Sequence, residues 1–170
     1  MTELDQYFTP KWVTEELLLV IPSIASSKTF EPCAGLGGIS KVISASHTND
    51  LDKSFDTNTH EDATNRLAWE RFPTCDWVVT NPPYANDAGF KILRHAYAHA
   101  KLGVAFLMRL SFLEPTQHRQ EWLYNNPPDL MIVLPRVRFI GKTPDFVTSA
   151  WFVWYKTIIL GPRGIKVSNR

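Results

Sequence analysis

The stretch DWVVTNPPY, residues 76–84, runs from a continuous apolar segment directly into a rigid turn. An unbroken apolar run such as residues 76–80 is typical of a strand that is covered on both faces, as in a parallel sheet. The two consecutive prolines fix φ and remove two backbone donors, and the residue before Pro82 is held in an extended conformation. The sequence therefore predicts a buried strand whose end presents Asn81 and Tyr84 in fixed positions.

Similar apolar runs recur along the chain and alternate with segments of helical spacing. We predict strands over 28–33, 46–52, 76–80, 103–110, 129–135 and 149–156. We predict helices from Pro10 to Pro22, with Thr9 as N-cap, and over about 37–45, 63–72, 87–101 and 116–124. This alternation predicts an α/β fold with a doubly wound, mostly parallel sheet. The end of the chain, GPRGIKVSNR, is expected to be frayed.

The composition is that of a globular protein with one core. The chain has 170 residues, of which 44% are hydrophobic, and a net charge of +1 gives no global attraction to nucleic acids or membranes. An anionic partner would have to meet a local patch. The amino terminus lacks a signal-peptide pattern and no run approaches the roughly 18 apolar residues of a membrane span, so we expect a cytoplasmic location. Cys33 and Cys75 lack metal-type spacing and are interpreted as reduced thiols.

A glycine-rich turn follows the first predicted strand in FEPCAGLGG, residues 30–38. Ligands of open parallel sheets bind outside the carboxyl ends of the strands, and glycines let a ligand approach the backbone. The glycine spacing differs from GxGxxG, which disfavours NAD. Asp50 lies 19 residues after Glu31, which suits an acid that receives ribose hydroxyls, and Asp52 is the alternative. In the other interpretation the glycines only make a tight turn and both aspartates are solvated.

The turn at 81–84 suits a planar amine. The side-chain oxygen of Asn81 and the carbonyl of Pro82 can accept both hydrogens of an exocyclic amino group, while Tyr84 offers a ring face for stacking. A nitrogen that attacks a carbon acquires positive charge, and fixed acceptors stabilise that charge more in the transition state than in the ground state. The turn is thus a candidate site for a nucleophilic amino group.

Three motifs occur in a characteristic order: QYFTP at 6–10, EPCAGLG at 31–37 and NPPY at 81–84. Together they resemble the S-adenosylmethionine-dependent amino-methyltransferases, most closely the DNA adenine-N6 group, over residues 5–156. The resemblance implies one catalytic domain over 1–170 with a seven-stranded, Rossmann-like class I methyltransferase sheet and a tail over 157–170. It implies an enzyme of prokaryotic or phage type that moves a methyl group from S-adenosylmethionine to N6 of a flipped-out adenine in DNA, by in-line displacement and without a metal.

The resemblance also implies roles for individual residues. The catalytic residues would be Asn81, Pro82, Pro83 and Tyr84. The cofactor-binding residues would be Tyr7, Thr9, Glu31, Pro32, Cys33, Ala34, Gly35, Gly37, Asp50, Asp62, Ala63 and Asn81. Among these, Tyr7 and Thr9 would hold the methionine carboxylate, and Asp62 the adenine amino group of the cofactor. Asp62 can also be interpreted as a helix N-cap before ATNRL, and the two roles are compatible.

Target recognition is the point at which the sequence departs from the family. Members commonly carry a target-recognition domain, and the sequence shows no separate domain of that kind. A phosphate-binding and stacking patch is predicted in the irregular stretch 135–148, with Arg136, Arg138, Phe139 and Lys142. The alternative is a solvated loop with a buried Phe. Arg109 and Arg119 are candidates to extend the patch, whereas the pair His95 and His99 lacks the further ligands of a metal site.

There are three alternatives to this function. An NPPY turn serves equally well for an adenine in RNA or for a glutamine side chain in a protein. A third hypothesis is a non-catalytic subunit that needs a second chain, for example one that supplies target recognition. No membrane partner is expected.

Overall fold

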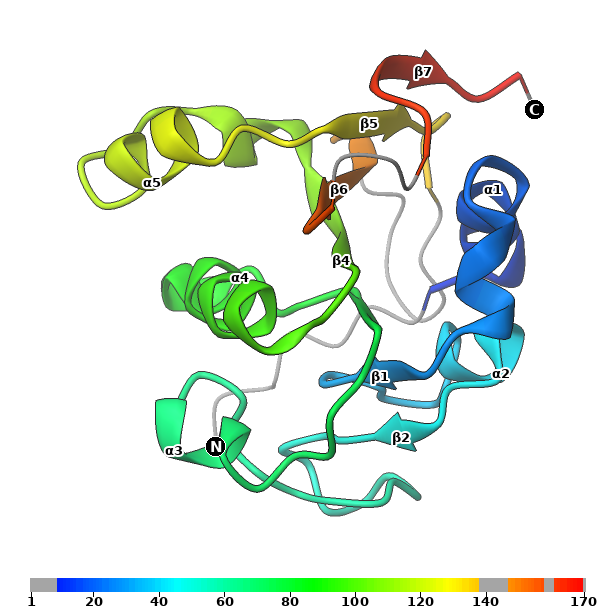
Figure 1. Cartoon of the computed structure of the whole chain (residues 1–170), viewed down its shortest axis with the longest axis vertical. Coiled ribbons are helices and arrows are strands. Elements are labelled where there is room, and N and C mark those ends of the chain that lie inside the picture. The colour runs from blue at the N-terminus through cyan, green and yellow to red at the C-terminus, as the bar shows by residue number, and fades with distance from the viewer. Residues whose placement is uncertain (1–8, 138–146, 158–160, 170) are drawn as a thin grey trace.

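The computed structural model describes residues 9–137, 147–157 and 161–169. Its centre is a seven-stranded sheet in the order β2-β1-β3-β4-β6-β5-β7 (Figure 1). The strands are β1 (Thr29–Glu31), β2 (His47–Thr48), β3 (Trp77–Thr80), β4 (Gly103–Arg109), β5 (Leu130–Val133), β6 (Ser149–Tyr155) and β7 (Gly164–Val167). β6 runs antiparallel to its neighbours β4 and β5, and the other pairs are parallel. The prediction of an α/β fold with a mostly parallel sheet is confirmed.

Helices cover both faces of the sheet (Figure 1). They are α1 (Lys11–Val20), α2 (Ser40–Ile43), α3 (Arg66–Trp69), α4 (Ala88–His99) and α5 (Gln120–Asn125), with 3-10 turns at Pro22–Ser26, Ala85–Asp87 and Leu110–Leu113. Side chains of α3, α4 and α5 pack with Val78 and Phe106 on one face. Side chains of α1 and α2 pack with Val79 and Leu107 on the other face. Successive residues of a strand point to opposite faces, so β3, β4 and β6 each contribute to both cores.

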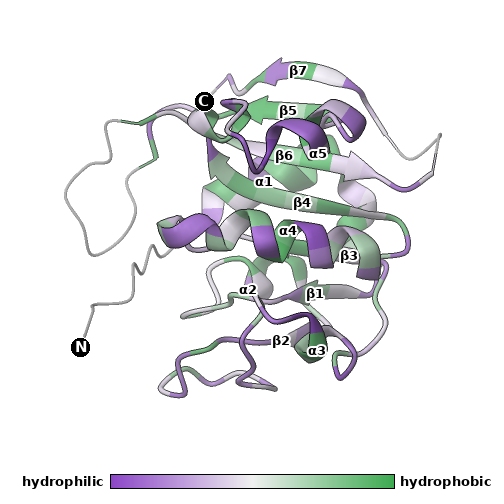
Figure 2. Ribbon diagram, turned by 90° about the vertical axis from the view of Figure 1, so that its left-hand side faces the viewer, coloured by the Kyte–Doolittle hydropathy of each residue, from purple (hydrophilic) through white to green (hydrophobic). Residues whose placement is uncertain are grey.

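The central strands carry the largest buried side chains. Figure 2 shows hydrophobic residues concentrated on β4 and its neighbours, with hydrophilic residues in the outer loops. Trp151 on β6 is fully buried, and its Nε1 donates to the carbonyl oxygen of Val13 in α1 at 2.7 Å. Phe30 of β1 packs against Trp69 and Phe72, with ring centroids 5.8 and 4.7 Å away. These contacts fix the helices onto the sheet. In the described ranges, every helix is too short or too polar to cross a membrane.

The end of the chain differs from its prediction. Residues 164–167 are not frayed but form β7, which pairs in parallel with β5. The amide of Gly164 donates to the Asp129 carbonyl and the amide of Ser168 to the Val133 carbonyl, so the strand satisfies backbone groups at the edge of β5. Arg163 forms an ion pair with Asp129 just before this strand. Residues 164–167 of the tail are therefore part of the sheet.

The start of α1 is a second difference. Pro10 is the N-cap, with an extended backbone, and no side chain caps the helix. The prediction of Thr9 as N-cap is wrong, because the Thr9 hydroxyl instead accepts a hydrogen bond from the side chain of Asn81. The helices predicted over 37–45 and 63–72 are also shorter than expected, and the shorter α2 and α3 leave irregular backbone beside the strand ends.

Candidate active site

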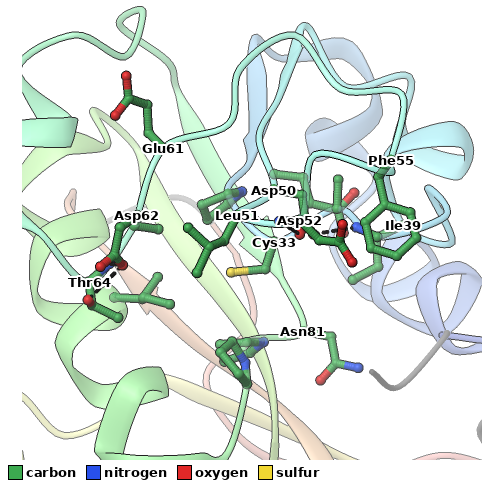
Figure 3. Close-up of a pocket in the computed structure, with 18 of the residues that line it drawn as sticks. Cys33, Ile39, Asp50, Leu51, Asp52, Phe55, Glu61, Asp62, Thr64 and Asn81 are labelled. Carbon is green, nitrogen blue, oxygen red and sulfur yellow. Dashed lines mark hydrogen bonds between the residues drawn. The ribbon is translucent and has the colours of Figure 1, made fainter. Parts of the chain in front are cut away.

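A pocket opens at the carboxyl ends of β1 and β3, where an open parallel sheet is expected to bind its ligand. The predicted site residues that line it are Thr9, Glu31, Pro32, Cys33, Ala34, Gly35, Asp50, Asp62, Ala63, Asn81, Pro82 and Pro83. Figure 3 shows Asp62 on one side of the pocket and Asp50 and Asp52 on the other, with Cys33 between them. Gly37 lies in the turn but not on the pocket wall, and Tyr7 lies outside the described residues.

The glycine turn is held by hydrogen bonds to acidic side chains. Asp50 accepts from the Gly35 amide at 2.8 Å and from the Asp52 amide at 2.9 Å. Glu31 accepts from the Ser40 amide at 2.6 Å. These amides are consequently committed to carboxyl groups of the protein itself and do not form a cradle for a phosphate group.

The N-terminal segment closes one side of the turn. A Cβ placed on Gly38 would lie 2.4 Å from the Thr9 carbonyl oxygen, which is too close for any residue with a side chain. Only glycine fits at this position. Gly37 adopts φ +81°, in the left-handed region that favours glycine. Gly38 thus lets Thr9 approach the turn closely, and Thr9 lines the pocket.

Glu31 is a buried acid, only 1% exposed. Burial raises the pKa of its carboxyl well above the usual value, although the hydrogen bonds from Ser40 act in the opposite direction. The group therefore favours its neutral form, and its clearest role is to hold the start of α2 against the end of β1. Burial likewise raises the pKa of the Cys33 thiol, with nearby Asp50 adding to the effect, so the pocket presents a neutral thiol.

Asp50 and Asp52 both line the pocket. Asp50 uses each carboxylate oxygen once within the turn, and each oxygen retains a second acceptor position. Asp52 accepts from the Ser54 amide at 2.9 Å. Either aspartate is placed to receive hydroxyl groups.

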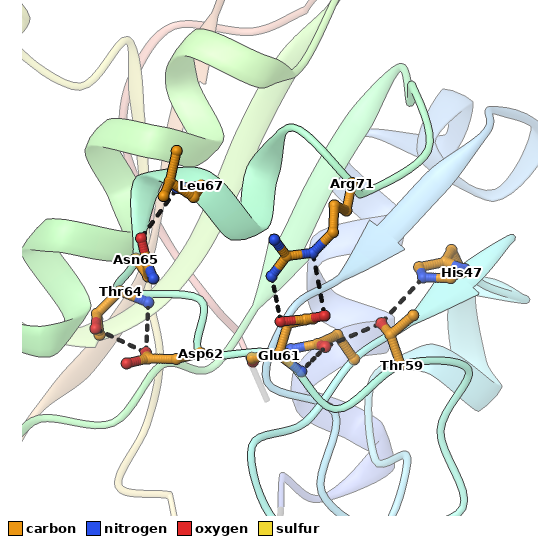
Figure 4. A network of polar contacts seen from close by, with 9 residues as sticks. His47, Thr59, Glu61, Asp62, Thr64, Asn65, Leu67 and Arg71 are labelled. Atoms are coloured by element: carbon orange, nitrogen blue, oxygen red, sulfur yellow. Dashed lines mark hydrogen bonds and ion pairs between the residues drawn. The ribbon is translucent and has the colours of Figure 1, made fainter.

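Asp62 stands on the opposite wall and does not cap a helix. Its Oδ1 accepts from the amide and the hydroxyl of Thr64 at 2.9 and 2.7 Å. The N-cap of α3 is Asn65, whose side chain accepts from the Leu67 amide at 3.0 Å (Figure 4). The alternative interpretation of Asp62 as the N-cap is wrong, because the helix begins later than the sequence suggested. The local turn leaves Asp62 beside the pocket.

Asn81 is oriented by hydrogen bonds at both ends of its side chain. Its Nδ2 donates to the Thr9 hydroxyl at 3.2 Å, and its Oδ1 accepts from the Tyr84 hydroxyl at 3.0 Å. The amide oxygen is therefore directed toward Tyr84. The contact between Thr9 and Asn81 was not predicted, because the two residues are 72 positions apart in the sequence.

A second pocket adjoins the first one on the far side of the prolines. Pro82 and Pro83 line both pockets, whereas Tyr84 lines only the second. The other residues of this second pocket are Asp87, Gly89, Phe90, Met108, Arg109, Ser111, Phe112, Glu114 and Arg119. The Arg119 side chain is fixed by the Phe112 carbonyl at 2.9 Å and by the Thr116 hydroxyl at 3.0 Å. The turn at 81–84 is thus the partition between two adjacent hollows.

Arg109 is a residue of the second pocket that the sequence analysis named only as a candidate to extend the phosphate-binding patch. It is the last residue of β4 and lines the second pocket, with its guanidinium over the Tyr84 ring. β3 and β4 are parallel neighbours, with Thr80 opposite Phe106. Asn81 directly follows β3, and Arg109 is the last residue of β4. The strand pattern of the sequence could therefore have predicted that these two residues lie close together.

Most of the predicted DNA patch lies outside the described residues. Arg136 is described and exposed, while Arg138, Phe139 and Lys142 fall in the range 138–146. The rings of His95 and His99 lie near Trp69, and His99 Nε2 is 3.0 Å from the Pro73 carbonyl oxygen. Within the described part of the chain, no three His, Cys, Asp or Glu side chains gather as a metal site would require.

No protein-family model matches the chain, and no curated protein matches it in sequence. Several solved structures share its fold. A protein from Listeria monocytogenes assigned as a class I S-adenosylmethionine-dependent methyltransferase matches with a TM-score of 0.67 and 14% identity, over 99% of this chain and 67% of that one. A protein from Pyrococcus horikoshii assigned as an RNA methyltransferase matches with a TM-score of 0.67 and 18% identity, over 92% of this chain and 87% of that one.

The M protein of the type I restriction enzyme EcoKI matches with a TM-score of 0.66 and 15% identity, over 98% of this chain and 47% of that one. The chain therefore spans about half the length of that modification subunit. These likenesses show that the protein has the class I methyltransferase fold.

Proposed function

We propose that this protein is an S-adenosylmethionine-dependent methyltransferase that methylates the exocyclic N6 of adenine in DNA. The observation that carries the proposal is the partition between the two pockets. Pro82 and Pro83 contribute to both hollows, and Asn81 lines the first while its amide oxygen is hydrogen-bonded to Tyr84 of the second. This arrangement suits a methyl donor on one side and a planar amine on the other.

The chemistry of the first pocket fits the donor. The described residues that line it include carboxylates and no Lys or Arg, which favours a cationic ligand over a phosphorylated one. S-adenosylmethionine, when bound, supplies a methyl group on a positively charged sulfur. In the proposal, Asp50 or Asp52 accepts from its ribose hydroxyls, Asp62 accepts from its adenine amino group, and Thr9 lies near its methionine end. Residues 31–35 form the floor of the first pocket in this proposal.

The second pocket would take the target base. In the proposal, the Asn81 side-chain oxygen, which is directed by the Tyr84 hydroxyl, accepts one hydrogen of the amine. The Pro82 carbonyl would accept the other hydrogen. The two acceptors stabilise the charge that develops on the nitrogen, and position and electrostatics supply the rate enhancement. Stacking on Tyr84 would offset part of the few kcal/mol that unstacking the base costs.

The NPPY turn and the names of two structural neighbours favour DNA as the substrate. Two of these neighbours are named as subunits of type I restriction systems, from EcoKI and from Streptococcus thermophilus. The chain covers 47% and 45% of them, so we propose that a further domain or a second chain takes part in target recognition. RNA is the second candidate substrate, because another neighbour is named as an RNA methyltransferase.

The test is methyl transfer from labelled S-adenosylmethionine to unmethylated DNA, to RNA and to a protein extract in parallel, followed by nucleoside and amino-acid analysis. N6-methyladenine in DNA is the expected product, and Asn81→Ala should form none. Label in RNA or in glutamine would replace the proposed substrate. Binding of the donor without transfer to any of the three would indicate that a second chain is needed, and absence of binding would overturn the proposal.

A further inference from the structure

Asn49 is a buried polar residue directly after β2, and its side chain is 0% exposed with every hydrogen-bonding position filled. Its Nδ2 donates to the carbonyl oxygens of Pro32 and Glu61, both at 3.0 Å. Its Oδ1 accepts from the Thr59 hydroxyl at 2.9 Å and from the Glu61 amide at 2.8 Å. A carboxamide offers two donor hydrogens and two acceptor positions, so this one is fully used.

The partners of Asn49 belong to opposite walls of the first pocket. Pro32 lies in the turn after β1, and Glu61 directly precedes Asp62 (Figure 3). The second wall has little regular structure of its own, because between β2 and α3 the described backbone contains only an isolated bridge, from Asn49 to Thr59. The Asn49 side chain is therefore a principal link from this irregular segment to the sheet.

The main chain of Asn49 supports the same link on the β1 side. Its amide donates to the Glu31 carbonyl and its carbonyl accepts from the Ala34 amide, both at 2.9 Å. Asn49 is thus fixed to the first wall by main chain and side chain, and to the second wall by its side chain. On the outer side, Glu61 is paired with Arg71 through both carboxylate oxygens (Figure 4).

We propose that Asn49 is a positioning residue for the cofactor pocket, one whose carboxamide sets the separation between the turn at 32–35 and the segment at 61–64. For the identity of the ligand, this inference rests on the function proposed above. A carboxamide fits this place because it can do two things at once. It donates to the carbonyl oxygens of Pro32 and Glu61, and it accepts from the Thr59 hydroxyl and the Glu61 amide. A carboxylate would face the carbonyls of Pro32 and Glu61 without a hydrogen, and an apolar side chain would take away the partner of both carbonyls and of the Glu61 amide.

The first experiment measures the affinity of S-adenosylhomocysteine by calorimetry for the wild type, Asn49→Asp, Asn49→Ser and the control Asn58→Asp. Asn58 is exposed on the same loop, and its Oδ1 accepts from the Thr48 amide and hydroxyl at 2.8 and 3.0 Å. An Asp at 58 keeps that acceptor and introduces the same charge. We expect binding about tenfold or more weaker in Asn49→Asp, a smaller loss in Asn49→Ser, and a change of at most about twofold in Asn58→Asp.

A pH series separates positioning from a general loss of stability. A buried carboxyl at position 49 regains a donor when it is protonated, so the affinity of Asn49→Asp should recover as the pH falls from 8 to 6. The titratable and charged groups around it are Asp50, His47, His60, and Glu61 with Arg71. These groups are present in every variant, and the difference between Asn49→Asp and Asn58→Asp therefore isolates position 49.

Amide hydrogen exchange of the free proteins gives a readout that needs no ligand. Exchange should rise in peptides covering 32–38 and 59–64 of Asn49→Asp and of Asn49→Ser, while peptides of β4 and β6 stay as in the wild type. Wild-type affinity together with wild-type exchange in both variants would overturn the inference. Failure of the wild type to bind the ligand would instead overturn the proposed cofactor, and the exchange result alone would then decide the role of Asn49.

Discussion

The guanidinium carbon of Arg109 lies 4.9 Å from the centre of the Tyr84 ring. A cation at this distance over an aromatic face is attracted by about 0.5–2 kcal/mol, depending on its exposure to water. Tyr84 in turn donates its hydroxyl to Asn81. A chain of contacts therefore runs from the end of β4 through the aromatic ring to the side chain that is proposed to receive the target amine.

We predict that Arg109→Gln lowers kcat about tenfold while the affinity for S-adenosylmethionine stays within about twofold, because Arg109 restrains Tyr84 and does not line the first pocket. Arg109→Lys should be intermediate, since an ammonium keeps the charge but loses the planar stacking surface. Steady-state kinetics with varied donor and varied DNA separate the two effects. An unchanged kcat in Arg109→Gln would show that the stacking has no catalytic consequence.

Asn81→Ala should reduce methyl transfer by at least about 100-fold, because an acceptor that acts mainly in the transition state is lost. The affinity for S-adenosylhomocysteine should change only a few-fold. Single-turnover transfer and calorimetry measure the two quantities. Asn125→Ala is the matched control, because Asn125 is exposed on α5 and its amide donates to the Glu121 carbonyl of the same helix at 2.9 Å. An active Asn81→Ala enzyme would contradict the proposed mechanism.

Asp50→Ala should weaken cofactor binding at least about tenfold and also lower the melting temperature, since the amides of Gly35 and Asp52 both lose their acceptor. Asp52→Ala should have a smaller effect on both. Calorimetry and thermal unfolding of the two variants distinguish their roles. A larger loss of affinity in Asp52→Ala than in Asp50→Ala would move the proposed ribose contact to Asp52.

The buried carboxyl of Glu31 should make the protein less stable as the pH rises. Burial holds its folded-state pKa well above the usual value of 4.5, so between these two pKa values the folded state retains a proton that the unfolded state has lost. Stability therefore falls with pH across that window. His47 and His95 act in the opposite direction, because burial lowers their pKa values.

Glu31→Gln isolates the contribution of this carboxyl, because a Gln oxygen can still accept from the Ser40 amide. The free energy of unfolding, measured by urea denaturation between pH 5 and pH 8, should fall less with pH in Glu31→Gln than in the wild type. Parallel curves for the two proteins would show that Glu31 is ionised in the folded state.

The sequence predicted the elements whose burial is reflected in their hydrophobic pattern. The strands around 76–80, 103–110 and 149–156 are covered on both faces, so their apolar runs stand out. β7 escaped prediction because all of its residues are exposed and its pairing with the edge of β5 leaves no periodic signal. Its stability comes from backbone pairing that composition does not reveal.

The part of the candidate site that lies at the ends of strands was predictable from the sequence. The residues after β1, β2 and β3 gather because the carboxyl ends of neighbouring parallel strands lie along the same edge. The contacts of Asn81 with Thr9, of Tyr84 with Arg109 and of Asn49 with Pro32 depend on the direction of individual side chains across the fold. Element spacing does not determine those directions.

The hydrogen bond from Trp151 to Val13 also bears on the order of folding. These residues are 138 positions apart, so α1 cannot complete its docking until β6 has been synthesised and has joined the sheet. Thr9 precedes this helix and lines the first pocket. During translation, the pocket would therefore be completed late, after most of the chain has left the ribosome, and a nascent protein would bind no cofactor with full affinity before then.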